Sequence, residues 1–131
     1  MKILAIESSS STLYLAIQNE KKIFHLKSDS INNTAKNINS MVDKILKKSK
    51  TSLNEIDAIA ISSGPGSFTS LRVGMSYAKG LSLTLDIPIV PISTFEILLF
   101  SNIKKVDGDT SVVIYSHGRT VYKLSLIHIS E

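Results

Sequence analysis

The chain of 131 residues contains no cysteine. Without thiols it forms neither a disulfide framework nor a metal site built on thiolates, and we expect a cytoplasmic protein. Long apolar runs are also missing, because every apolar stretch falls far short of a membrane span. The apolar run at residues 3–6 is too short for the hydrophobic core of a signal peptide. The sequence therefore predicts one globular α/β unit without membrane contact.

Signatures of catalysis are scarce. A Walker phosphate loop needs a lysine and a hydroxyl after its second glycine, but Gly66 is followed by Ser67. The residues around Ser67 do not form the G-x-S-x-G pattern of a nucleophile elbow. The histidines, His25, His117 and His128, are far apart and show no metal-binding spacing. The sequence thus predicts neither catalytic nor metal-binding residues.

A two-metal nuclease site of the ribonuclease H kind would need a cluster of carboxylates. Glu7 ends the first predicted strand, in a suitable place. Asp57 begins a strand instead of ending one, and Asp107 and Asp109 lie in a predicted loop. One carboxylate does not make such a site, so we favour a surface or capping role for Glu7.

Positive charge exceeds negative charge, with a formal net charge of +4. Such an excess is compatible with a nucleic-acid partner. The clustered lysines, Lys44, Lys47, Lys48 and Lys50, lie at the C-terminal end of a predicted helix, where the helix dipole favours cations. Because aromatic residues do not alternate with these lysines along the chain, we favour a solvated helix end over RNA contact.

The hydrophobic pattern switches between a period of two and a period of 3.6 residues. Strand patterns occupy residues 2–6, 13–18, 22–27, 56–61, 88–92 and 111–115, helix patterns 34–48, 67–85 and 94–100, and a further segment 120–129. Hairpins come first and crossovers later, which predicts a mixed β-sheet with flanking helices. This order resembles one lobe of the actin-like, sugar-kinase and heat-shock ATPase architecture, which is related to ribonuclease H.

The most informative segment is the turn between the strand at 56–61 and the helix at 67–85. The turn and the first residues of the helix are Gly64, Pro65, Gly66, Ser67, Phe68 and Thr69. Backbone N–H groups at such a turn form a ready anion site, and Ser67 or Thr69 suits the helix cap. Arg72, one turn further on, is in place to order an anion or to be an ordinary exposed residue. The hydroxyl-rich turn at residues 8–12 is open to two interpretations, phosphate binding or a hairpin that satisfies its own backbone.

Gly74 and Gly80 lie inside the helix at 67–85, where each costs about 1 kcal/mol relative to alanine. Close packing explains that cost better than ligand binding. A strip of small residues on this helix would let another helix or a sheet approach closely. The strip consists of Ser70, Gly74 and Ala78.

These motifs resemble the bacterial tRNA threonylcarbamoyladenosine biosynthesis family called TsaB or YeaZ. Residues 3–9 look like the family's I-L-A-I-D-T-S opening, and residues 64–81 are similar to its G-P-G-S-F-T-G-[LV]-R-[IV]-G…A-[KQ]-G-L signature. The resemblance covers roughly residues 1–123. Three features depart from the family: Asn33 replaces a histidine, Ser70 replaces a glycine, and the acidic positions of segment 115–122 are lost.

The resemblance implies a non-catalytic subunit that pairs with the catalytic paralogue TsaD and acts with the ATPase TsaE. Together they place threonylcarbamoyl on the adenosine beside the tRNA anticodon, with ATP and metal held by the partner subunits. In the family, the first two helices form the partner surface and also make homodimers. The matching candidate interface residues are Ile38, Met41, Val42, Ile45, Ser70, Leu71, Gly74, Met75 and Ala78.

Two other functions stay open at this point. One is a sugar- or acetate-kinase-like phosphotransferase that uses the turn at 64–67 for nucleotide phosphates, and the other is a stand-alone anion-binding module.

The end of the chain gives a separate expectation. Residues 124–131 look like the translation of a sequencing-library adaptor, although a genuine terminal strand has the same pattern. We expect residues 1–123 to be the N-terminal lobe of a protein whose C-terminal lobe is missing here.

Overall fold

The structure is a computed structural model that describes residues 1–102, 110–115 and 121–126. Its strands are β1 (Lys2–Glu7), β2 (Tyr14–Asn19), β3 (Lys22–Lys27), β4 (Ala58–Ser62), β5 (Ile89–Ile92), β6 (Thr110–Tyr115) and β7 (Val121–Leu126). Its helices are α1 (Thr34–Lys48), the short 3-10 helix η1 (Leu53–Glu55), α2 (Phe68–Leu85) and α3 (Thr94–Ser101). No helix in these described stretches is long and apolar enough to cross a membrane.

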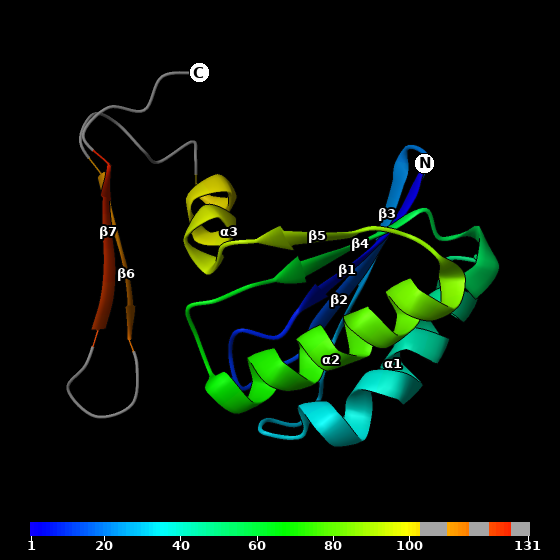
Figure 1. The fold of residues 1–131 in the computed structure, drawn as a ribbon, viewed down its shortest axis with the longest axis horizontal. Coiled ribbons are helices and arrows are strands. Elements are labelled where there is room, and N and C mark those ends of the chain that lie inside the picture. The colour runs from blue at the N-terminus through cyan, green and yellow to red at the C-terminus, as the bar shows by residue number, and fades with distance from the viewer. Residues whose placement is uncertain (103–109, 116–120, 127–131) are drawn as a thin grey trace.

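Five strands form the main sheet in the order β3-β2-β1-β4-β5. The β1–β2 and β2–β3 pairs are antiparallel, whereas β1–β4 and β4–β5 are parallel. The predicted mixed sheet with early hairpins and later crossovers is confirmed. A separate antiparallel pair, β6–β7, lies beside α3, beyond the carboxyl end of β5 (Figure 1).

The core lies between one face of the sheet and the helices α1 and α2, which both cover that face (Figure 1). Alternating positions of the three central strands point into it, so that Leu4, Ile17 and Ile59 are each 0% exposed. Ile45 of α1 meets them from the helix side and is also 0% exposed. The opposite face of the sheet carries no helix from the described residues.

Most predicted element bounds agree with the structure, and α1 matches its predicted range of 34–48. Helix α2 begins at Phe68, one residue later than predicted, and η1 was not predicted at all. The predicted segment 120–129 is described only as β7, which ends at Leu126. Four residues weighed from the sequence lie outside the described residues: Asp107, Asp109, His117 and His128.

The predicted domain boundary at residue 123 stays a prediction. Strand β7 crosses it, and Leu124 pairs with Val112 of β6.

Candidate functional site

The turn between β4 and α2 is fixed by hydrogen bonds to two neighbouring loops. The backbone N–H of Ser67 donates to the Ser9 carbonyl oxygen at 2.7 Å, and the N–H of Thr94 donates to the Gly64 carbonyl oxygen at 2.9 Å. The sequence predicted that backbone N–H groups of this turn could bind an anion. The N–H of Ser67 instead donates its hydrogen bond within the chain. These two hydrogen bonds join the turn to the β1–β2 loop and to the start of α3.

Glycine is favoured at Gly64, Gly66 and Gly74 for different structural reasons. Gly64 has a φ of +99°, a backbone conformation that favours glycine. A Cβ at Gly66 would overlap the carbonyl oxygen of Ser9, and a Cβ at Gly74 would overlap the Ser8 hydroxyl. Close packing therefore explains Gly66 and Gly74, with the β1–β2 loop as the neighbour in both cases.

Gly80 is different. A Cβ there would meet no atom within 4 Å, and the residue is exposed. The close-packing explanation for Gly80 is wrong within this chain.

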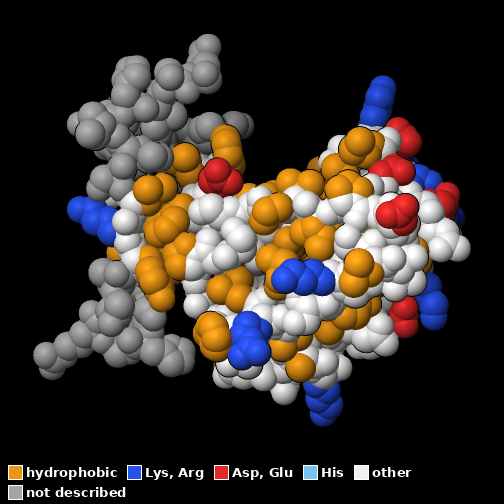
Figure 2. All heavy atoms as spheres, viewed as in Figure 1, with side chains coloured by type: hydrophobic (Ala, Val, Ile, Leu, Met, Phe, Trp, Pro, Cys, Tyr) orange, Lys and Arg blue, Asp and Glu red, His pale blue; other side chains and the backbone are white. Residues whose placement is uncertain are grey.

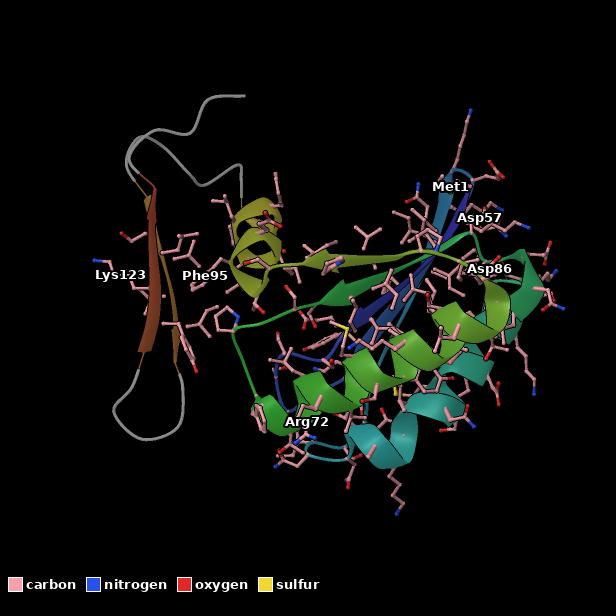
Figure 3. All side chains as sticks on the ribbon, in the orientation of Figure 1. Met1, Asp57, Arg72, Asp86, Phe95 and Lys123 are labelled. Carbon is pink, nitrogen blue, oxygen red and sulfur yellow. The ribbon has the colours of Figure 1, made fainter. Side chains whose placement is uncertain are left out.

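Helix α2 begins with an exposed aromatic residue. Ser67 holds the N-cap position, but its side chain makes no capping hydrogen bond. Phe68 is 71% exposed, and the Arg72 guanidinium carbon lies 5.3 Å from the centroid of its ring. Such a geometry allows a cation–π contact. Figure 3 shows Arg72 at this end of α2, on the side away from the sheet, so its observed contact is Phe68 and an anion-ordering role stays a prediction.

A groove of about 590 Å³ runs between the N-terminal halves of α1 and α2. Ala35, Val73 and the Phe68–Arg72 pair line it. At its wall, the Tyr77 hydroxyl donates to Asn39 Oδ1 at 3.1 Å. Burial raises the pKa of Tyr77, and the charge of Asp43 raises it further. The groove is thus mainly apolar, with polar groups at its edge.

A second hollow, of about 920 Å³, lies at the carboxyl ends of the parallel strands. It lies among the serine-rich β1–β2 loop, the start of α2, α3 and the β6–β7 pair. Thr94 lines it, and the Thr94 Oγ1 is buried without a hydrogen-bond partner among the described residues. None of the described lining residues is a lysine or an arginine. The hollow therefore offers hydroxyl and backbone groups without a cation.

The structure turns most of the predicted interface residues inward. Leu71 and Met75 are partly exposed. The other seven are buried inside this chain: Ile38, Met41, Val42, Ile45, Ser70, Gly74 and Ala78. They lie on the sides of α1 and α2 that pack on the sheet and on each other, so a partner would meet other residues. A partner surface on these two helices stays a prediction. The large apolar residues that α2 exposes are Phe68 and Leu83.

The fold has clear relatives among solved structures. "YeaZ from Pseudomonas aeruginosa" superposes with a TM-score of 0.86 at 24% identity, over 98% of this chain and 62% of that one. Thermus thermophilus RuvC bound to a Holliday junction gives a TM-score of 0.50 at 10% identity, over 74% of this chain and 67% of that one. At these identities the likeness concerns the fold alone, and it confirms the predicted ribonuclease H- and actin-like fold.

Sequence comparison identifies the family. Residues 28–125 match the family model described as TsaD, tRNA N6-adenosine threonylcarbamoyltransferase. The protein named tRNA threonylcarbamoyladenosine biosynthesis protein TsaB from Buchnera aphidicola of Acyrthosiphon pisum is 35% identical over 92% of this chain and 55% of that protein. The Escherichia coli protein of the same name is 38% identical over 72% of this chain and 41% of that protein. The chain belongs to the TsaD family and, within it, to the TsaB (YeaZ) group.

The chain spans about half the length of the curated relatives that it matches. The central signature at residues 64–81 lies inside the region matched by the family model.

Proposed function

We propose that this chain acts in tRNA threonylcarbamoyladenosine biosynthesis as a non-catalytic subunit that pairs with a TsaD-type catalytic subunit. The names of its relatives support the pathway. In this proposal, ATP and metal are held by the partner subunits, a TsaE-type ATPase joins the assembly, and tRNA is bound through the complex. We further propose that residues 1–123 form the N-terminal lobe of a two-lobed protein.

The pairing is supported by exposed apolar side chains on the outer side of α2. Phe68 is 71% exposed at the start of α2, and Leu83 is 85% exposed near its end. Between them the helix exposes the small residues Ser76 and Gly80, which leave its backbone open to a neighbouring helix. Figure 2 shows hydrophobic side chains on this face of the molecule, with lysine and arginine side chains among them. A partner that buried these side chains would gain about 25 cal/mol for each Å² of apolar surface.

The test is co-migration with a purified TsaD-type subunit in size-exclusion chromatography, followed by a titration that gives the dissociation constant. We expect a complex with the wild-type chain and at least about tenfold weaker binding for Phe68→Ala, since an exposed aromatic anchor is a common hot spot. Phe100→Ala is the matched control, because Phe100 is also exposed, at 65%, but lies on α3. The proposal would be contradicted if both variants lost the same affinity for the TsaD-type subunit, or if the wild-type chain formed no complex with it.

The same chromatography distinguishes a homodimer from a heterodimer. If α1 and α2 also make homodimers, the wild-type chain alone elutes as a dimer, and Phe68→Ala shifts it towards the monomer. ATP turnover by the isolated chain would contradict the non-catalytic role.

A further inference from the structure

A second surface lies at the opposite end of α1, where that helix ends beside the β2–β3 turn. It is a hollow of about 600 Å³. We call it the lysine hollow and define it by Lys21, Lys22, Lys48, Lys50 and Phe24. The groove that carries the proposed pairing is lined instead by residues from the first half of α1, such as Ala35. The two surfaces are therefore separate.

The lysine hollow is strongly positive. All four lysines are exposed, and none of them forms an ion pair with any described residue. The described lining includes one carboxylate, Glu20, whose Oε1 already lies 3.6 Å from the N-terminal ammonium group of Met1. Four lysines around one hollow create a positive potential, so the arrangement favours an anionic ligand with several charges.

The helix dipole accounts for only part of this cluster. Lys48 is in the last turn of α1, where a cation is favoured, and its Nζ also donates to the His25 carbonyl oxygen at 3.0 Å. Lys21 and Lys22 belong to the β2–β3 hairpin and gain nothing from that dipole. Their position beside the helix end is a property of the fold.

An aromatic ring lies among these charges. Phe24 of β3 is partly buried against the core, and it also lines the lysine hollow. Along the sequence no aromatic residue alternates with the lysines, but in space Phe24 lies among them. Lysines that neutralise phosphates, combined with an aromatic face on which a base stacks, are the usual elements of a single-stranded nucleic-acid site.

We propose that the lysine hollow is an RNA-binding site of this chain, in which lysines contact backbone phosphates and an unpaired base stacks on Phe24. For Lys48 and Lys50, this proposal differs from the interpretation as a solvated helix end; Lys44 and Lys47 do not line the hollow. The choice of RNA, and of tRNA in particular, rests on the proposed function, whereas binding of a single-stranded nucleic acid rests on the charges and the ring. In an assembly, RNA would be bound here while the α1–α2 groove holds the protein partner.

The test measures binding of the full chain to an unmodified tRNA transcript by fluorescence anisotropy at several salt concentrations. The triple variant Lys21→Gln, Lys22→Gln and Lys50→Gln should weaken binding at least about tenfold and reduce the salt slope by roughly 2 to 3, at about 0.7–0.9 per lost phosphate contact. The control triple variant loses the same charge elsewhere, through Lys36→Gln, Lys79→Gln and Lys123→Gln. Figure 3 shows Lys123 on β7, at the far side of the molecule.

Phe24→Leu keeps an apolar side chain in the core and should weaken tRNA binding about tenfold, because base–aromatic stacking is lost. Its thermal unfolding is measured alongside, and heparin, a polyanion without bases, should bind this variant as tightly as wild type. The proposal would be overturned if the two triple variants lost the same tRNA affinity, or if the wild-type chain did not bind tRNA. It would also be overturned if Phe24→Leu lost heparin binding and tRNA binding equally. Since the triple variant should still co-migrate with the TsaD-type subunit, failure here is distinguishable from failure of the proposed pairing.

Discussion

Gly74 of α2 packs directly against the side chain of Ser8, where β1 ends, so that even a methyl group at position 74 would overlap the Ser8 hydroxyl. This contact brings the middle of α2 onto the sheet. It makes Gly74 a core residue of this chain.

Gly74→Ala should therefore destabilise the isolated chain by about 1–3 kcal/mol, the usual cost of overpacking a core. Gly80→Ala is the matched control in the same helix. Its Cβ would meet open space, so the helix should gain about 0.5–1 kcal/mol. Urea unfolding followed by circular dichroism measures both values. A Gly74→Ala chain as stable as wild type would contradict the close contact with Ser8.

The Lys2–Glu55 pair predicts a pH effect at the start of the sheet. Lys2 Nζ donates to Glu55 Oε1 at 2.7 Å, and this bond, followed by the backbone N–H of Ser52, lowers the pKa of Glu55 from its usual 4.5. Because the folded-state pKa is depressed, the stabilisation is present above pH 4.5 and is lost as the pH falls through the lowered pKa. In an NMR titration, the pKa of Glu55 should rise in Lys2→Gln but stay below 4.5, since the Ser52 bond remains.

The raised pKa of Tyr77 predicts a change in stability at alkaline pH. Burial, and then the charge of Asp43, raise the pKa of Tyr77 above its usual 10.0. The folded state therefore favours the neutral phenol, and this stabilisation is present below pH 10.0 and lost as the pH rises through the raised pKa. In an ultraviolet titration, Asp43→Asn should lower the pKa of Tyr77 only partly, because burial is the larger cause. A return to 10.0 would show that charge and not burial dominates.

Two neighbouring hydroxyls at the start of α3 should respond in opposite directions. Ser93 Oγ accepts a hydrogen bond from the Phe95 N–H at 3.1 Å, so Ser93→Ala should cost about 1 kcal/mol of stability. Thr94 Oγ1 is buried without a partner among the described residues, so Thr94→Val should leave stability unchanged or raise it by up to about 1–2 kcal/mol. Thermal unfolding of the two variants measures both effects. A destabilised Thr94→Val would show that the hydroxyl has a partner in solution.

The sequence predicted the fold well because the periods of the helices and strands follow from which residues must be buried. It could not say what buries them. Ile38 and Ala78 have the same pattern whether a helix packs on its own sheet or on a partner, and here they pack inside the chain. The lysine hollow could not be predicted either, because β3 brings Phe24 to Lys48 from a distant part of the sequence.

The short helix η1 could have been found. Ser52 and Glu55 form a capping box, in which the Ser52 N–H donates to Glu55 Oε2 at 2.6 Å. The spacing S-x-x-E is a recognised sign of a helix start. Its apolar content was too small for the periodicity to show.

The two edges of the main sheet have a consequence for the behaviour of the chain in concentrated solution. Strand β3, at one edge, exposes Lys22 and Lys27, and strand β5, at the other, contains Pro91, which has no N–H to donate. Charges and proline at edges block the docking of a further strand from another molecule. Both edges of the main sheet are thus protected against the addition of a further strand, and growth of this sheet from molecule to molecule is disfavoured.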